Sequence, residues 1–237
     1  MADRASFRTD RAAILAGLRS RVARMEGSGR VSGRGAIPVA PAVDAALPAG
    51  GLARGAVHEL LEADPGAAAG FAALMLARAG GPVLWIAPDP DAWPPGLVAL
   101  GLSPADLVLV RAVGEDALWA LEEALRCPAI AGAVAVCPAL ALTASRRLQL
   151  AAEAGGGLGL VLRPDTEAVS PTASLTRWRV EARPGTAGPR HALTDPAWRL
   201  ELLKSRGGRP GAWDVTLRPD GRLETPAPAV RPVARAG

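Results

Sequence analysis

Short apolar runs alternate with helical patterns between residues 47 and 163, and this alternation restricts the fold more than any other feature of the sequence. The runs have the length of strands, and the stretches between them place apolar residues at helical spacing. Such a succession is typical of an α/β fold, a mostly parallel sheet flanked by helices. The expected strands are 56–61, 83–87, 107–111, 133–137 and 159–163, and the expected helices are 70–79, 95–100, 116–126 and 145–154.

The last third of the sequence changes its pattern. Residues 176–182 and 198–223 alternate polar and apolar side chains around Gly-Gly and Asp-Gly turn signals. This predicts antiparallel C-terminal strands appended to the parallel sheet. Residues 224–237 show no core-forming pattern, so we expect a disordered tail.

The first forty residues are set apart from the rest. Residues 9–25 predict a separate N-terminal amphipathic helix, and residues 27–43, rich in Gly, Ser and Pro, predict a flexible linker. The apolar stripe of that helix includes Ile14, Leu15, Leu18 and Val22. We expect this stripe to dock on its own domain, on another subunit or on a partner, and we take its four residues as the candidate partner-binding site.

Composition excludes several classes of protein. Two cysteines cannot build a disulfide framework, and no His, Cys and carboxylate cluster has metal-ligand spacing, so neither a secreted scaffold nor a metal site is expected. The N-terminus lacks the apolar stretch of a signal peptide, which indicates a cytoplasmic protein. The uncharged stretch 127–145 is long enough for a membrane span, but its prolines favour a buried strand and a turn, so no membrane partner is expected.

The loop after the first core strand stands where a phosphate-binding loop would lie, between a strand and a helix. Gly70 matches the last glycine of GxxxxGK[ST], but Pro65 replaces the first glycine, Phe71 the lysine and Ala72 the Ser/Thr. Phe71 offers no positive charge to phosphates and Ala72 no magnesium ligand. The sequence therefore predicts a degenerate phosphate loop without ATP hydrolysis and without a cofactor. A rearranged nucleotide site at the helix N-terminus stays open as an alternative.

Two further positions lack the chemistry of an NTPase. Cys137 ends a strand where a magnesium-orienting Asp would stand, and Pro88 follows another strand where a water-activating Glu would stand. His58 and His191 have no Ser or Cys at suggestive spacing, so we interpret both as structural. We expect no catalytic residue in the chain.

Several segments together resemble one known family. These segments include LPAGGLARGAVHEL at 47–60, DALWALEEALRC at 116–127, LTASRRLQLAAE at 142–153 and WRLELLKSRGGRPGAW at 198–213. In this order they are similar to the ImuA family, over about three quarters of the chain. The resemblance implies a RecA-like domain over 47–223, preceded by the helix and linker in 1–46. It also implies a non-catalytic accessory role in SOS-induced, error-prone translesion DNA synthesis in the cytoplasm at the nucleoid, with an ImuB-like Y-family polymerase homologue and RecA as partners.

Two other functions stay open beside this one. A SulA-type cell-division inhibitor resembles the same core, and a DNA-dependent ATPase is disfavoured by Phe71, Ala72 and Cys137. Single-stranded DNA is a further candidate partner, because arginines interleave with tryptophans in the last third of the chain. The candidate DNA contacts are Arg177, Arg179, Arg206 and Arg209.

Overall fold

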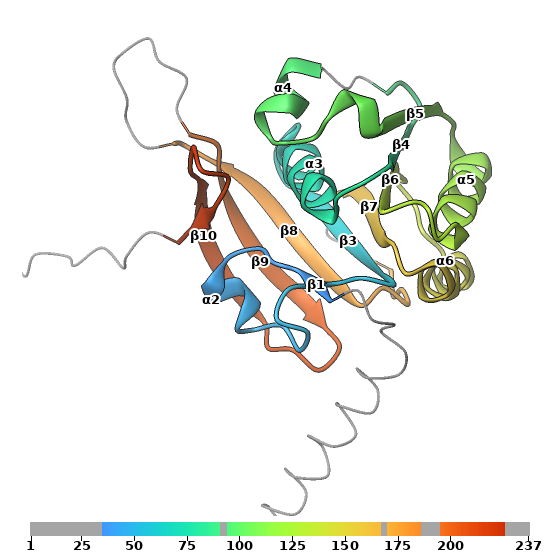
Figure 1. Ribbon diagram of the computed structural model, residues 1–237. Helices are drawn as coiled ribbons and strands as arrows, with labels where there is room; N and C mark the ends of the chain where they lie inside the picture. Colours follow the sequence, from blue (N-terminus) through green and yellow to red (C-terminus); the bar gives the residue numbers. More distant parts are fainter. Residues whose placement is uncertain (1–34, 91–93, 167–169, 186–194, 226–237) are drawn as a thin grey trace, which may run out of the picture.

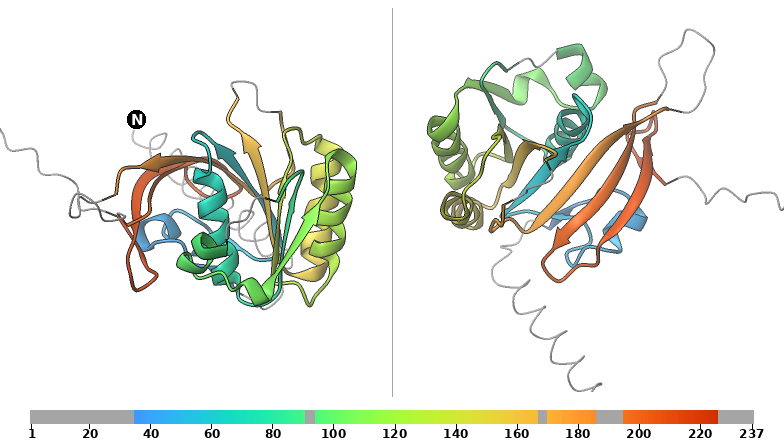
Figure 2. Two further views of the ribbon diagram at one scale, coloured as in Figure 1. Left: turned by 90° about the horizontal axis from the view of Figure 1, so that it is seen from above. Right: turned by 180° about the vertical axis from the view of Figure 1, so that it is seen from behind.

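The computed structural model describes residues 35–90, 94–166, 170–185 and 195–225. Its centre is a nine-stranded sheet with the order β11-β10-β9-β8-β3-β7-β6-β4-β5 (Figure 1). Helices cover both faces of one half of this sheet, and the other half curves away as a set of long strands (Figure 2). The predicted α/β class, a mostly parallel sheet flanked by helices with antiparallel strands near the C-terminus, is confirmed.

The parallel half of the sheet contains the five strands expected from the sequence. They are β3 (Ala56–Glu62), β4 (Val83–Ala87), β5 (Leu107–Arg111), β6 (Gly132–Val136) and β7 (Leu158–Pro164). Strands β3, β7, β6 and β4 are almost entirely buried, because helices lie on both sides of them. Strands buried on both faces read as continuous apolar runs, which is why the sequence revealed them.

The helices are divided between the two faces of the sheet. Helix α3 (Ala67–Ala79) lies on one face with the short α4 (Pro94–Ala99), while α5 (Gly114–Arg126) and α6 (Leu142–Gly155) lie side by side on the other (Figure 1). A one-turn 3-10 helix, η1 (Pro104–Asp106), precedes β5. The division creates two apolar clusters, one beneath α3 and one beneath α5 and α6.

The C-terminal half of the sheet is formed by β8 (Thr176–Arg183), β9 (Ala197–Ser205), β10 (Gly211–Leu217) and β11 (Leu223–Glu224). Strand β8 runs parallel to β3 and antiparallel to β9, so it joins the two halves. The expected hairpin pattern is thus found in β9 to β11, whereas the strand expected at 176–182 continues the parallel sheet on one side. Alternation buries Trp178 and Trp198 on the same side of the sheet.

Residues 36–53 belong to the core, in contrast to the linker predicted for much of this stretch. They form β1 (Ala36–Ile37), α2 (Pro41–Asp44) and β2 (Leu52–Ala53), with β1 and β2 antiparallel. Val43 is fully buried in the cluster beneath α3. Gly51 permits the tight crossing, since a β-carbon there would lie 2.5 Å from the Ile37 carbonyl oxygen. Periodicity could not reveal this segment because its apolar residues are held by distant strands.

No helix in the described ranges is long and apolar enough to cross a membrane. The uncharged stretch 127–145 contributes instead to β6, to a connecting turn and to the first turn of α6.

Candidate functional site

The loop between β3 and α3 is too short to wrap a phosphate. Helix α3 begins at Ala67, so Gly70 lies inside the helix and only four residues connect the two elements. Gly66 adopts a left-handed conformation with φ of 79° and donates its N–H to Glu62 Oε1 at 2.8 Å, while the Ala67 N–H donates to the Asp64 carbonyl at 3.1 Å. A phosphate loop needs such N–H groups free for its ligand. Here intramolecular acceptors occupy both.

The position of the phosphate-binding lysine is part of the apolar core. Phe71 is 1% exposed and Ala72 is fully buried. The Phe71 ring meets the edge of Trp198 with ring centroids 6.3 Å apart and an interplanar angle of 64°. Trp198 in turn donates its indole N–H to the Ala67 carbonyl at 3.1 Å. This region therefore packs α3 against β9, and its side chains provide no cation.

The two other NTPase positions are equally unsuited to magnesium or to water activation. Cys137 is buried after β6, and burial raises the pKa of its thiol to about 11, which keeps it protonated. Pro88 follows β4, and the neighbouring Asp89 is 2.8 Å from Arg111 in an ion pair with side chains 81% and 74% exposed. Asp89 thus joins the ends of β4 and β5 at the surface.

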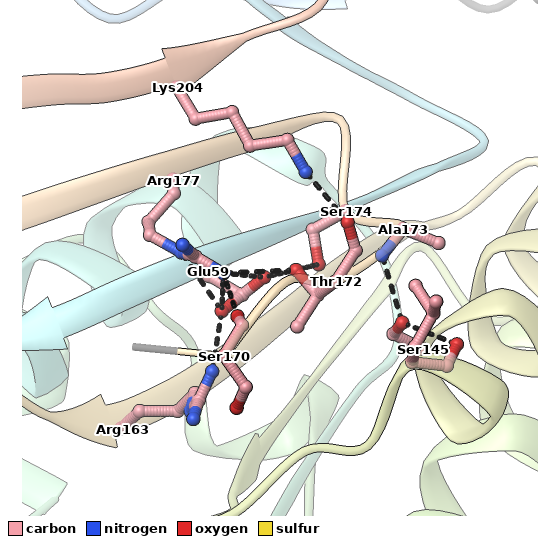
Figure 3. Close-up of polar contacts among 10 residues, drawn as sticks. Glu59, Ser145, Arg163, Ser170, Thr172, Ala173, Ser174, Arg177 and Lys204 are labelled. Atoms are coloured by element: carbon pink, nitrogen blue, oxygen red, sulfur yellow. Dashed lines mark hydrogen bonds and ion pairs between the residues drawn. The ribbon is translucent and has the colours of Figure 1, made fainter. Parts of the chain in front are cut away.

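Charged and polar side chains surround Glu59 in a buried cluster (Figure 3). Glu59 is fully buried on β3, with Arg163 Nη1 at 2.9 Å and Arg177 Nη2 at 3.2 Å from its Oε2 atom. The Thr172 hydroxyl donates to its other oxygen. Burial alone would raise the pKa of Glu59, but the hydrogen bonds and the nearby arginines outweigh it and hold that pKa below its usual value. The carboxylate is therefore stable in its charged form.

The same cluster fastens the segment that returns from β7 to β8. Arg177 donates to the Ser170 carbonyl at 2.8 Å, and Lys204 donates to the Thr172 carbonyl at 2.7 Å. The Ser145 hydroxyl of α6 accepts from the Ala173 N–H at 2.8 Å (Figure 3). Strands β3, β7, β8 and β9 and helix α6 thus meet at one polar centre. Its hydrogen bonds are internal, which fits a structural role.

His58 is a satisfied core residue. Its Nε2 lies 2.9 Å from the Ala53 carbonyl, which can only accept, so Nε2 carries the proton. The Thr176 hydroxyl therefore donates to Nδ1 at 2.7 Å and accepts from the Trp178 indole at 2.7 Å. Complete burial lowers the pKa of His58 to about 4. The neutral ring, which faces no cysteine, agrees with the structural interpretation.

The four candidate DNA contacts fall into two kinds. Arg177 is committed to Glu59, and Arg179 pairs with Asp165 at 2.6 Å and with Glu201 at 3.0 Å. Arg206 and Arg209 lie exposed in and next to the β9–β10 turn, where Arg206 donates to the Ala173 carbonyl. These two remain available to a phosphate backbone.

The tryptophans of β8 and β9 face away from the arginines. Neighbouring residues of a strand point to opposite faces, so Trp178 and Trp198 enter the core whereas Arg177 and Arg199 lie on the reverse side. The interleaving seen in the sequence therefore cannot combine base stacking with phosphate contacts on one surface of β8 and β9.

Some predicted positions cannot be placed. Ile14, Leu15, Leu18, Val22 and His191 lie outside the described residues. Across the part that is described, no group of three or more His, Cys, Asp and Glu side chains could hold a metal ion. The Glu59 cluster was missed by sequence reasoning, and only the adjacent polar residues His58 and Glu59 within a strand expected to be buried could have drawn attention to it.

Fold and site together define an α/β protein in which apolar packing fills the position of a phosphate-binding loop. No family model matches the sequence. Over 193 residues the chain is 43% identical to "Protein ImuA" from two strains of Caulobacter vibrioides, covering 73% of this chain and 79% of each relative. The chain belongs to the ImuA family.

Proposed function

We propose that this chain is an accessory protein of DNA-damage-induced translesion synthesis, acting by binding an ImuB-like polymerase homologue and RecA. The observation that carries the proposal is the 43% identity to Protein ImuA over 193 residues. Identity of this extent covers 73% of the chain rather than one motif. In this proposal the chain is a scaffold of the error-prone mutasome in the cytoplasm, and another protein of the mutasome copies the damaged DNA.

The lack of catalysis in this proposal is supported by the loop after β3. Phe71 and Ala72 are buried, and the nearby N–H groups of Gly66 and Ala67 have internal acceptors. Hydrolysis of ATP requires groups that neutralise the phosphates and orient magnesium. We therefore propose a protein that retains the architecture of an ATPase while its mechanism is binding alone.

Size-exclusion co-elution tests the proposal directly. The purified full chain is mixed with the ImuB-like protein, and separately with RecA and single-stranded DNA. We expect a complex with each protein. Failure to co-elute with either one would contradict a direct-contact scaffold, and cell filaments on overexpression would then favour a division inhibitor.

A further inference from the structure

The outer surface of α5 and α6 exposes two large apolar side chains. Trp119 on α5 is 62% exposed and Leu150 on α6 is 65% exposed. Glu122 and Arg147 form an ion pair across the two helices. Trp119 precedes Glu122 by three residues and Leu150 follows Arg147 by three, so each lies one turn from that pair. We call this surface the α5–α6 face.

The α5–α6 face is acidic around its tryptophan. Glu115, Asp116 and Glu123 stand four before, three before and four after Trp119, which places them beside it on the helix. Arg126 is shared between Glu122 and Glu123. Together the two helices carry five carboxylates against three arginines. An exposed aromatic side chain within a carboxylate rim fits a basic segment that offers apolar side chains.

We propose that residues 9–25 of the same chain dock on the α5–α6 face. This segment carries four arginines against one aspartate, and its expected apolar stripe includes Ile14 and Leu18. Its charge is opposite to that of the face, and its apolar residues can cover Trp119 and Leu150. A helix of 17 residues would be about 25 Å long, comparable to α5 at about 20 Å.

The described chain begins close to this surface. Ala36 pairs with Ala53 in β1 and β2, and a β-carbon at Gly55 would lie 3.4 Å from the Ala152 carbonyl near the end of α6. Gly155 of α6 in turn packs against the Leu125 carbonyl near the end of α5. Residues 26–34 can span up to about 30 Å, which suffices to reach along both helices. Tethering at this range gives an effective concentration of about 1 mM, which favours docking within one molecule.

Docking would cover the stripe that is expected to bind partners. While residues 9–25 occupy the α5–α6 face, a partner could not bind Ile14 and Leu18. The contact is thus a built-in competitor of partner binding. Its test needs no partner, so it can fail or succeed independently of the proposed function.

Hydrogen exchange of the full chain, followed by mass spectrometry, tests the docking. We expect the amides of residues 9–25 to exchange at least about 10-fold more slowly than in an isolated peptide of that sequence. Trp119→Asp and Leu150→Asp should each return them to within about 2-fold of the peptide rate while α5 and α6 stay protected. Val98→Asp on α4, at an apolar side chain of 56% exposure, is the matched control and should change nothing.

Two results would overturn the proposal. One is exchange of residues 9–25 at the peptide rate in the unmodified chain, and the other is protection that survives both Trp119→Asp and Leu150→Asp. Protection should also be unchanged on about 100-fold dilution, because a tethered segment does not depend on protein concentration. Loss on dilution would contradict docking within one molecule.

Discussion

Two buried sites on opposite faces of the sheet lie on and after strand β3. An ATPase needs charged groups after this strand, but here that position is apolar and the charged groups lie within the strand. At the end of the strand, where phosphates would bind, Phe71 and Trp198 form an apolar contact. Near the middle of the strand, where apolar packing is usual, Glu59 holds two arginines. The Glu59 carboxylate and its two arginines therefore lie in the joint between strands and away from the position of a phosphate-binding loop.

The difference shows what each site contributes. Phe71 attaches α3 to β9, and Glu59 attaches β3 to β7, β8 and the segment before β8. Both sites connect the parallel half of the sheet to the C-terminal half. The following changes test this contrast, beginning with the largest expected effect.

Phe71→Lys should destabilise the fold more than any other change, because it places a charged group in the apolar core. The same substitution restores the lysine of a phosphate loop. The ammonium would enter the contact with Trp198, and we expect a loss of more than about 4 kcal/mol in the free energy of unfolding. Phe71→Met retains the apolar contact and should cost below about 2 kcal/mol. Urea denaturation measures both values. Equal and small losses would mean that the site tolerates a cation, contrary to its assignment as core.

Glu59→Gln should cost about 3 to 5 kcal/mol, because it leaves the buried Arg163 and the largely covered Arg177 without their counter-charge. Asp89→Asn is the matched control, since Asp89 pairs with Arg111 at a similar distance on the surface. Exposed pairs contribute only about 0 to 1 kcal/mol. The two variants are compared by urea denaturation. A Glu59→Gln variant as stable as Asp89→Asn would show that the Glu59 cluster does not hold the sheet together.

A smaller effect should come from His58 as the pH falls. Its pKa is about 4 in the folded chain, against a value near 6.5 when unfolded, so between these pH values only the unfolded state takes up a proton. Stability is therefore complete above pH 6.5 and declines toward pH 4, by up to about 1.4 kcal/mol per pH unit. His58→Gln should flatten this slope relative to the unmodified chain. Identical slopes in the variant and in the unmodified chain would be inconsistent with a buried neutral His58.

The sequence revealed the parts of the fold that local patterns determine. Strands β3, β4, β6 and β7 are apolar because both faces are covered, and α5 shows an apolar stripe opposite its carboxylates. The loop between β3 and α3 was also expected from the sequence, although α3 begins at Ala67, three residues before the expected helix. These features depend on residues that are near one another in the chain.

The Glu59 cluster and the β1–α2–β2 segment could not be predicted in the same way. Arg163 lies 104 residues after Glu59, and Thr172 lies 113 residues after it. Sequence reasoning therefore treated Arg177 as a DNA contact without its buried partner. Val43 likewise has no periodic neighbours and is held by residues that lie far away in the chain. Tertiary contacts decide both cases.

Thermal unfolding with and without ATP and magnesium decides whether the region around Phe71 is core packing or a nucleotide site. ATP at 100 times its Kd would add about 2.7 kcal/mol to the free energy of unfolding. This raises the Tm of a domain of this size by about 5 to 10 °C. We predict no change of Tm at millimolar ATP. A rise of several degrees that Phe71→Met abolishes would contradict the account.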